Sequence, residues 1–71
     1  MMELLIFRTD IKSADRVRHI QTILDDYPGV ISWSVDLEDI DNVLRIEATA
    51  ELSEMEVMVL GRQQGYDIRA L

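Results

Sequence analysis

Apolar and polar residues alternate in a way that divides the first half of the chain into distinct segments. An apolar run over residues 3–8 predicts a strand. Apolar positions then recur at steps of three and four from Val17 to Tyr27, which predicts an amphipathic helix of about four turns. Ser13 can cap the start of this helix, and the proline–glycine pair at 28–29 ends it.

The strictest alternation lies over residues 31–37 and predicts a second strand. One face of this strand would carry four apolar side chains: Ile31, Trp33, Val35 and Leu37. The acidic segment 38–42 predicts a turn, and residues 43–48 alternate again as a third strand that pairs back on the second. We expect the opposite face of the pair to be wet and to carry Ser32, Ser34, Asp36, Val43, Arg45 and Glu47.

A second helix is predicted after the third strand. Ser53, with Glu56 three residues later, forms a capping-box pattern at its start. We expect its apolar face to consist of Met55, Val57, Met58, Val59 and Leu60. Gly61 interrupts this face and is expected to let the helix approach the sheet closely. Gly65 can end the helix in a left-handed conformation, and residues 66–70 alternate as a final strand.

The order strand, helix, strand, strand, helix, strand predicts an α+β fold. It is the ferredoxin-like βαββαβ sandwich, in which two helices cover one face of a four-stranded antiparallel sheet. A chain of 71 residues is too short to bury a second core. We therefore expect residues 1–71 to form a single domain.

Composition restricts the partners and the chemistry. Fourteen acidic and seven basic residues give a formal charge of −7, which disfavours nucleic acid and anionic membranes. The absence of cysteine excludes disulfides, thiolate metal ligands and thiol nucleophiles. No apolar run approaches the ~20 residues of a membrane span, and the first residues lack a secretory signal. We expect a cytoplasmic protein without a cofactor.

The segment 9–17 resembles the metal-binding loop of heavy-metal-associated domains, the copper-chaperone family. A bacterial subgroup has Thr-Asn-Ile-Lys-Cys-x-x-Cys-Val where this chain has Thr-Asp-Ile-Lys-Ser-Ala-Asp-Arg-Val. The segments 28–30, 33–36 and 65–66 also recur at the spacing of such domains, so the resemblance covers nearly the whole chain. It implies a carrier or regulatory domain that holds copper(I) on two thiolates and passes it to a docking partner.

The chain departs from this family at the ligand positions. Ser13 and Arg16 stand where the family has its cysteines. A hydroxyl coordinates soft copper(I) weakly, and arginine places a permanent cation where a cation would have to bind. We therefore expect a degenerate metal loop that does not bind copper, with family positions at Asp10, Ile11, Lys12, Ser13, Arg16 and Tyr66.

Two other uses of the same loop stay open. Ser13 is most simply a helix cap, but free amides at the helix start and nearby basic side chains could form an anion pocket of Arg8, Lys12, Ser13 and Arg16. Asp15 and His19 are four residues apart on the first helix and could face one hard or borderline metal ion. Two ligands without a third make a weak metal site.

No nucleophile beside a base, open metal centre or unlike pair of carboxylates stands out, so we do not expect an enzyme. The favoured function is a non-catalytic binding or protein-interaction module. The alternative is a sensor that binds a small anion or a metal without thiolates.

Trp33 is expected in the core, or on a docking surface if its strand is a bare edge. Such an edge predicts a protein partner or self-association.

Overall fold

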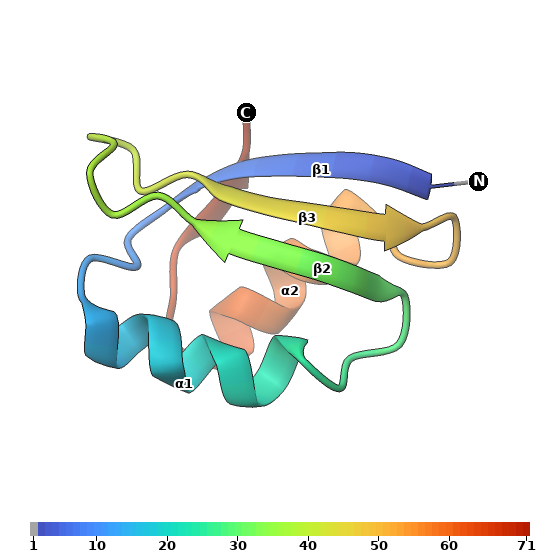
Figure 1. The fold of residues 1–71 in the computed structure, drawn as a ribbon, viewed down its shortest axis with the longest axis horizontal. Coiled ribbons are helices and arrows are strands. Elements are labelled where there is room, and N and C mark those ends of the chain that lie inside the picture. Colours follow the sequence, from blue (N-terminus) through green and yellow to red (C-terminus); the bar gives the residue numbers. More distant parts are fainter. Residues whose placement is uncertain (1) are drawn as a thin grey trace.

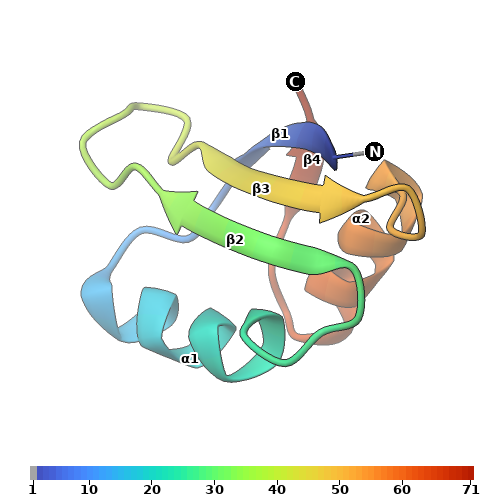
Figure 2. The ribbon, with the colours of Figure 1, turned by 45° about the vertical axis from the view of Figure 1, so that its right-hand side comes forward.

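The computed structural model describes residues 2–71 and confirms the expected order of elements. The strands are β1 (Met2–Thr9), β2 (Val30–Val35), β3 (Leu44–Thr49) and β4 (Ile68–Ala70), and the helices are α1 (Ala14–Leu24) and α2 (Glu54–Gln63). The sheet order is β2-β3-β1-β4, and all neighbours are antiparallel. Figures 1 and 2 show both helices on one side of the sheet, which is the ferredoxin-like sandwich. Within residues 2–71, no helix is long and apolar enough to cross a bilayer.

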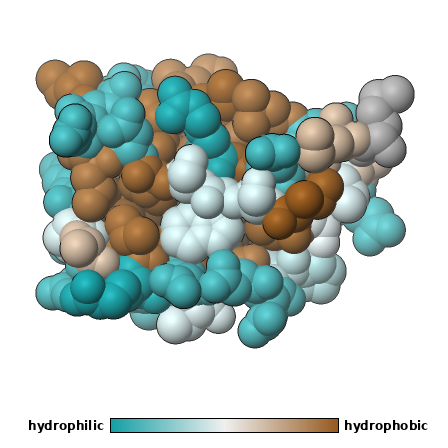
Figure 3. Space-filling view, in the orientation of Figure 1, coloured by the Kyte–Doolittle hydropathy of each residue, from teal (hydrophilic) through white to brown (hydrophobic). Residues whose placement is uncertain are grey.

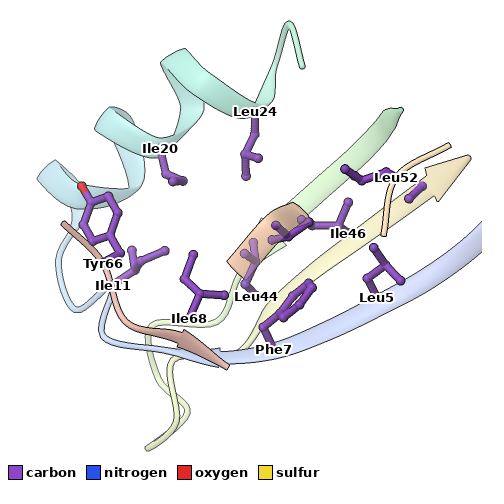
Figure 4. Packing of buried hydrophobic residues seen from close by; sticks show 12 residues of the cluster. Leu5, Phe7, Ile11, Ile20, Leu24, Leu44, Ile46, Leu52, Tyr66 and Ile68 are labelled. Atoms are coloured by element: carbon purple, nitrogen blue, oxygen red, sulfur yellow. The ribbon is translucent and has the colours of Figure 1, made fainter. Parts of the chain in front are cut away.

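The core lies between the sheet and the helices (Figure 4). The central strands β1 and β3 supply the sheet side of the core, because alternate side chains of a strand point to the same face. The inward side chains of these two strands are at most 8% exposed, and they are Leu5, Phe7, Leu44, Ile46 and Ala48. The helices complete the core with Ile20 and Leu24 of α1 and Val57 of α2.

Helix α1 is shorter than the periodicity predicts. It ends at Leu24 after 11 residues, about three turns, and Tyr27 lies in the turn that follows. Pro28 disfavours a helical backbone at the residue before it, which explains why the helix does not reach Tyr27. The Tyr27 hydroxyl donates to Glu56 Oε2 at 2.7 Å, and this hydrogen bond raises the pKa of Tyr27 above its usual value. The contact ties the segment after α1 to the first turn of α2.

The predicted apolar face of β2 is wrong at both of its ends. A β-bulge between Val30 and Ser32 shifts the pairing with β3 by one residue. Because of this shift, Val30 packs against the core while Ile31 is 55% exposed. Leu37 lies beyond the strand and is 41% exposed.

Trp33 lies within β2, and Val43 directly precedes β3. Trp33 packs half-buried against the core, and its Nε1 donates to Asp25 Oδ1 at 2.8 Å. Val43 was expected on the wet face but is 5% exposed. The strand alternation does not extend to it, because β3 begins one residue later and the Asp36 amide donates to the Val43 carbonyl at the base of the turn.

The inward stripe of α2 is narrower than predicted. Val57 and Gly61 are buried, whereas Met55 and Val59 are 66% and 43% exposed. Met55 and Val59 are each two positions from Val57. Two positions correspond to a rotation of about 200° around the helix axis, so both side chains lie on the outer side of α2. Ser53 caps the helix by accepting the Glu56 amide at 3.1 Å, but the Glu56 carboxylate accepts from Tyr27.

Both glycines of the α2 region have the expected roles. A Cβ on Gly61 would lie 2.3 Å from Ile68 Cδ1, so the absent side chain is what lets α2 approach β4. Gly65 has a φ of +87° and ends the helix. The Tyr66 amide donates to the Gly61 carbonyl at 2.9 Å, so Tyr66 belongs to the helix end and the strand starts only at Ile68.

Candidate functional site

The loop at residues 10–13 joins β1 to α1 and is tied to the turn at 36–43. The Thr9 amide donates to the Asp41 carbonyl at 2.9 Å, and its hydroxyl donates to the Asn42 carbonyl at 2.7 Å. The same hydroxyl oxygen accepts the Ile11 amide at 3.1 Å. The Ile11 side chain is fully buried and points toward Tyr66 and the core (Figure 4). Ile11 and Thr9 therefore hold the start of the loop in place.

Asp10 connects the loop to the segment before β4. Its amide donates to the Asp67 carbonyl at 3.2 Å, and its Oδ1 accepts the Asp67 amide at 3.0 Å. These two hydrogen bonds fix the loop against the chain segment that leads into β4. Asp67 Oδ1 in turn accepts from Arg69 Nε at 3.1 Å.

The two positions that the resemblance assigns to thiolates belong to a helix cap. Ser13 has an extended backbone, and its Oγ accepts the Arg16 amide at 3.2 Å. Arg16 reaches back over the loop, with Nη1 3.4 Å from the Asp10 carbonyl oxygen. The hydroxyl is therefore used to start α1, and the guanidinium lies against the main-chain carbonyl of Asp10 in the loop.

Asp15 and His19, the candidate metal pair, face different partners. Asp15 forms an ion pair with Arg18. His19 Nδ1 lies 2.6 Å from the Tyr66 hydroxyl, and the two rings are 5.6 Å apart at their centroids. In the described part of the chain, residues 2–71, no group of three or more His, Cys, Asp or Glu side chains is placed to hold a metal ion.

A surface hollow of about 300 Å³ lies beside the loop. It is lined by Arg8, Thr9, Asp10, Lys12, Ile40, Asp41, Asp67 and Arg69. Two members of the predicted anion pocket, Arg8 and Lys12, line it, whereas Ser13 and Arg16 do not.

The hollow gains a third cation that the sequence pattern did not indicate. Arg8 and Arg69 are direct register partners on β1 and β4. Only the pairing of β1 with β4 brings Arg69 next to Arg8, since the two residues are 61 positions apart in the sequence. Three carboxylates line the same hollow, so its formal charge is balanced: Asp10, Asp41 and Asp67.

Apolar side chains also reach the surface away from the loop. Figure 3 shows brown side chains exposed above the teal row that covers α1. The exposed apolar residues include Met2, Leu4, Ile31, Met55 and Val59, each more than 40% accessible. Met2 and Leu4 line a second hollow together with Glu3 and Glu47.

Comparisons with known proteins reveal a structural likeness. No protein-family model and no curated protein matches this sequence. Among solved structures, the chain is similar to one described as a "CsoZ metallochaperone", with a TM-score of 0.80 and 16% sequence identity. The match covers 96% of this chain and 97% of that chain. The two proteins therefore share the ferredoxin-like fold over nearly their whole length.

Proposed function

We propose that the chain is a non-catalytic protein-interaction module on a metallochaperone-like scaffold whose metal loop is degenerate. The observation that carries this proposal is the contact between the two positions assigned to thiolates. Ser13 Oγ accepts the Arg16 amide, and the Arg16 guanidinium lies against the Asp10 carbonyl. The likeness to a metallochaperone structure supports the scaffold, and the absence of cysteine supports the loss of the ion.

The chemistry of the loop argues against a metal carrier. Copper(I) prefers polarizable, charged sulfur, and a serine hydroxyl is hard and neutral. Arginine stays protonated in proteins, so no change of pH removes the cation at position 16. Exposed apolar residues such as Leu4 and Met55 suit contact with another protein.

The proposal predicts a gain of function on restoring the ligands. In a competition assay with a chromophoric copper(I) chelator, the wild-type chain is expected to leave the chelator complex intact. The double variant Ser13→Cys, Arg16→Cys is expected to withdraw about one copper(I) per chain, because it restores two thiolates at the start of α1. Tight, stoichiometric copper uptake by the wild type would refute the proposal, and calorimetric titration with zinc tests a borderline ion.

A second candidate function is anion sensing at the hollow beside the loop. The direct pairing of Arg8 with Arg69 favours it, because like charges opposite one another on neighbouring strands repel. An oxyanion that accepts hydrogen bonds from both guanidinium groups would relieve this repulsion. Asp10, Asp41 and Asp67 line the same hollow and oppose an anion, which is why this function ranks second.

The effect of phosphate on thermal unfolding distinguishes the interaction module from the anion sensor. For the interaction module, any increase in the midpoint of thermal unfolding by phosphate relative to chloride at equal ionic strength is expected to be the same in the wild type and in Arg69→Gln. Anion sensing instead requires a phosphate-specific increase that is lost in Arg69→Gln. Arg62→Gln is the matched control, because Arg62 lies in the last turn of α2 and does not line the hollow.

A further inference from the structure

We infer that the outer edge of β1, at residues 2–5, accepts an extended segment of a partner protein as an additional strand in which basic and apolar side chains alternate. The inference rests on the proposed function, since it names the surface and the partner chemistry of an interaction module. It uses the end of the molecule opposite the loop.

The main chain of β1 is free on one side over these residues. β4 pairs with β1 only at Phe7–Thr9, and the Leu71 amide then donates to the Ile6 carbonyl at 3.1 Å. Alternate residues of a strand direct their N–H and C=O groups to the same side, so those of Leu4 and Met2 also face this side. Within residues 2–71, no strand pairs with them there, and Figure 1 shows β1 continuing past the C-terminus.

The other side of β1 is fully paired, which defines the register of an added strand. β3 pairs with β1 from Met2 to Phe7, so the segment is already held extended. A partner strand antiparallel to β1 would continue the line of β4 and use the peptide groups of Leu4 and Met2. No rearrangement of the sheet is required.

The same residues present apolar side chains to the partner. Leu4 and Met2 are 57% and 59% exposed, because their neighbours Leu5 and Phe7 occupy the core face of β1. Their side chains line a hollow of about 300 Å³ with Glu3 and Glu47. Glu47 is the direct β3 partner of Leu4, so a long basic side chain opposite Leu4 can extend across it toward this carboxylate.

The charge of this end of the molecule determines which sign of charge the partner segment must carry. The segments 2–5, 23–31 and 47–57 contain no lysine or arginine and seven acidic residues: Glu3, Asp25, Asp26, Glu47, Glu51, Glu54 and Glu56. The remaining residues contain seven acidic and seven basic side chains, so the formal charge of −7 arises entirely from these segments.

These acidic segments also lie together in space. Met2 pairs with Thr49 and Val30 pairs with Ala48, while Tyr27 bonds to Glu56. They form the right-hand end of the molecule in Figure 1. A basic segment is therefore attracted to the free edge. A second copy of this chain is disfavoured, because it would bring Glu3 and Glu47 of both molecules to one interface.

The test uses two seven-residue peptides with blocked termini, one alternating lysine with valine and one alternating glutamate with valine. In an NMR titration, the lysine peptide is expected to shift the amide signals of Met2, Leu4 and Ile6. It is also expected to protect the Leu4 amide from hydrogen exchange, because that amide gains an acceptor. The glutamate peptide is expected to leave these signals unchanged.

Variants on the protein locate the site. Leu4→Lys is expected to weaken binding of the lysine peptide by about tenfold or more, because it places a like charge on the edge. The position is exposed, so the fold should be retained, and the dispersion of the amide spectrum checks this. Glu47→Gln is expected to weaken binding by about threefold, as a partly exposed charge pair would. Leu37→Lys is the matched control at the other end of the molecule and should stay within about twofold.

Several results would overturn the inference without touching the proposed function. They are equal binding of both peptides, no binding of the lysine peptide up to about 1 mM, or amide shifts on β2 in place of β1. A dimer in sedimentation experiments without peptide, with the same amides protected, would assign the edge to a second copy. Copper uptake by the wild type would instead refute the interaction module itself.

Discussion

Replacing Ile11 with alanine is expected to lower the free energy of unfolding by about 2–5 kcal/mol. Ile11 is fully buried and belongs to the core cluster that includes Tyr66 and Ile68 (Figure 4). Its neighbours come from β4 and the end of α2, which Gly61 holds in close contact, so they cannot easily move into the cavity. Equilibrium urea unfolding followed by Trp33 fluorescence measures the change.

The adjacent residue provides the control for this prediction. Lys12 is exposed, and Lys12→Ala is expected to change the free energy of unfolding by no more than about 0.5 kcal/mol. A loss below about 1 kcal/mol for Ile11→Ala would show that the loop is held by the hydrogen bonds of Thr9 and Asp10 and not by the core. The loop would then be free to rearrange around a ligand.

Replacing Gly61 with alanine is expected to destabilise the protein by about 1–3 kcal/mol. In an exposed helix the same change stabilises by about 1 kcal/mol, because alanine loses less backbone entropy. Here the new Cβ would lie 2.3 Å from Ile68 Cδ1 and 2.8 Å from Cγ1. Ile68 is only 6% exposed and cannot swing into solvent, so the steric cost exceeds the propensity gain.

A double-mutant cycle tests the cause of this effect. Ile68→Ala removes the two atoms nearest the new methyl group and leaves the Cβ of residue 68 at 3.3 Å. Gly61→Ala in that background is therefore expected to be neutral or stabilising, which is a coupling of at least about 1 kcal/mol and up to about 4 kcal/mol between the two sites. Urea unfolding of all four proteins gives the coupling. Additive losses would contradict close packing between α2 and β4.

Local signals in the sequence predict most of the fold. Ser13 and Ser53 start their helices, and Gly65 ends the second one, because capping depends on side chains within a few residues. The order of elements follows from the alternation pattern. The errors lie where strand pairing decides which side chains point to the core. A bulge between Val30 and Ser32 turns Ile31 toward solvent.

The candidate site is only partly predictable for the same reason. The absence of thiolates at Ser13 and Arg16 is visible in the sequence, since it depends only on residue type. Arg69 joins Arg8 through the register of β1 and β4, and His19 meets Tyr66 across 47 residues of sequence. Nothing near these residues in the chain indicates either contact.

The sequence by itself determines the type of fold and removes thiolate chemistry from the loop. Hydrophobic periodicity and caps act over a few residues, and residue type decides whether an ion can be held. Tertiary structure alone decided that β4 pairs with β1 at Phe7–Thr9 and that the acidic segments gather at the other end of β1. The pairing and the gathering of acidic segments depend on contacts between residues that are distant in sequence. Local patterns do not encode such contacts, and only the packing of the whole chain determines them.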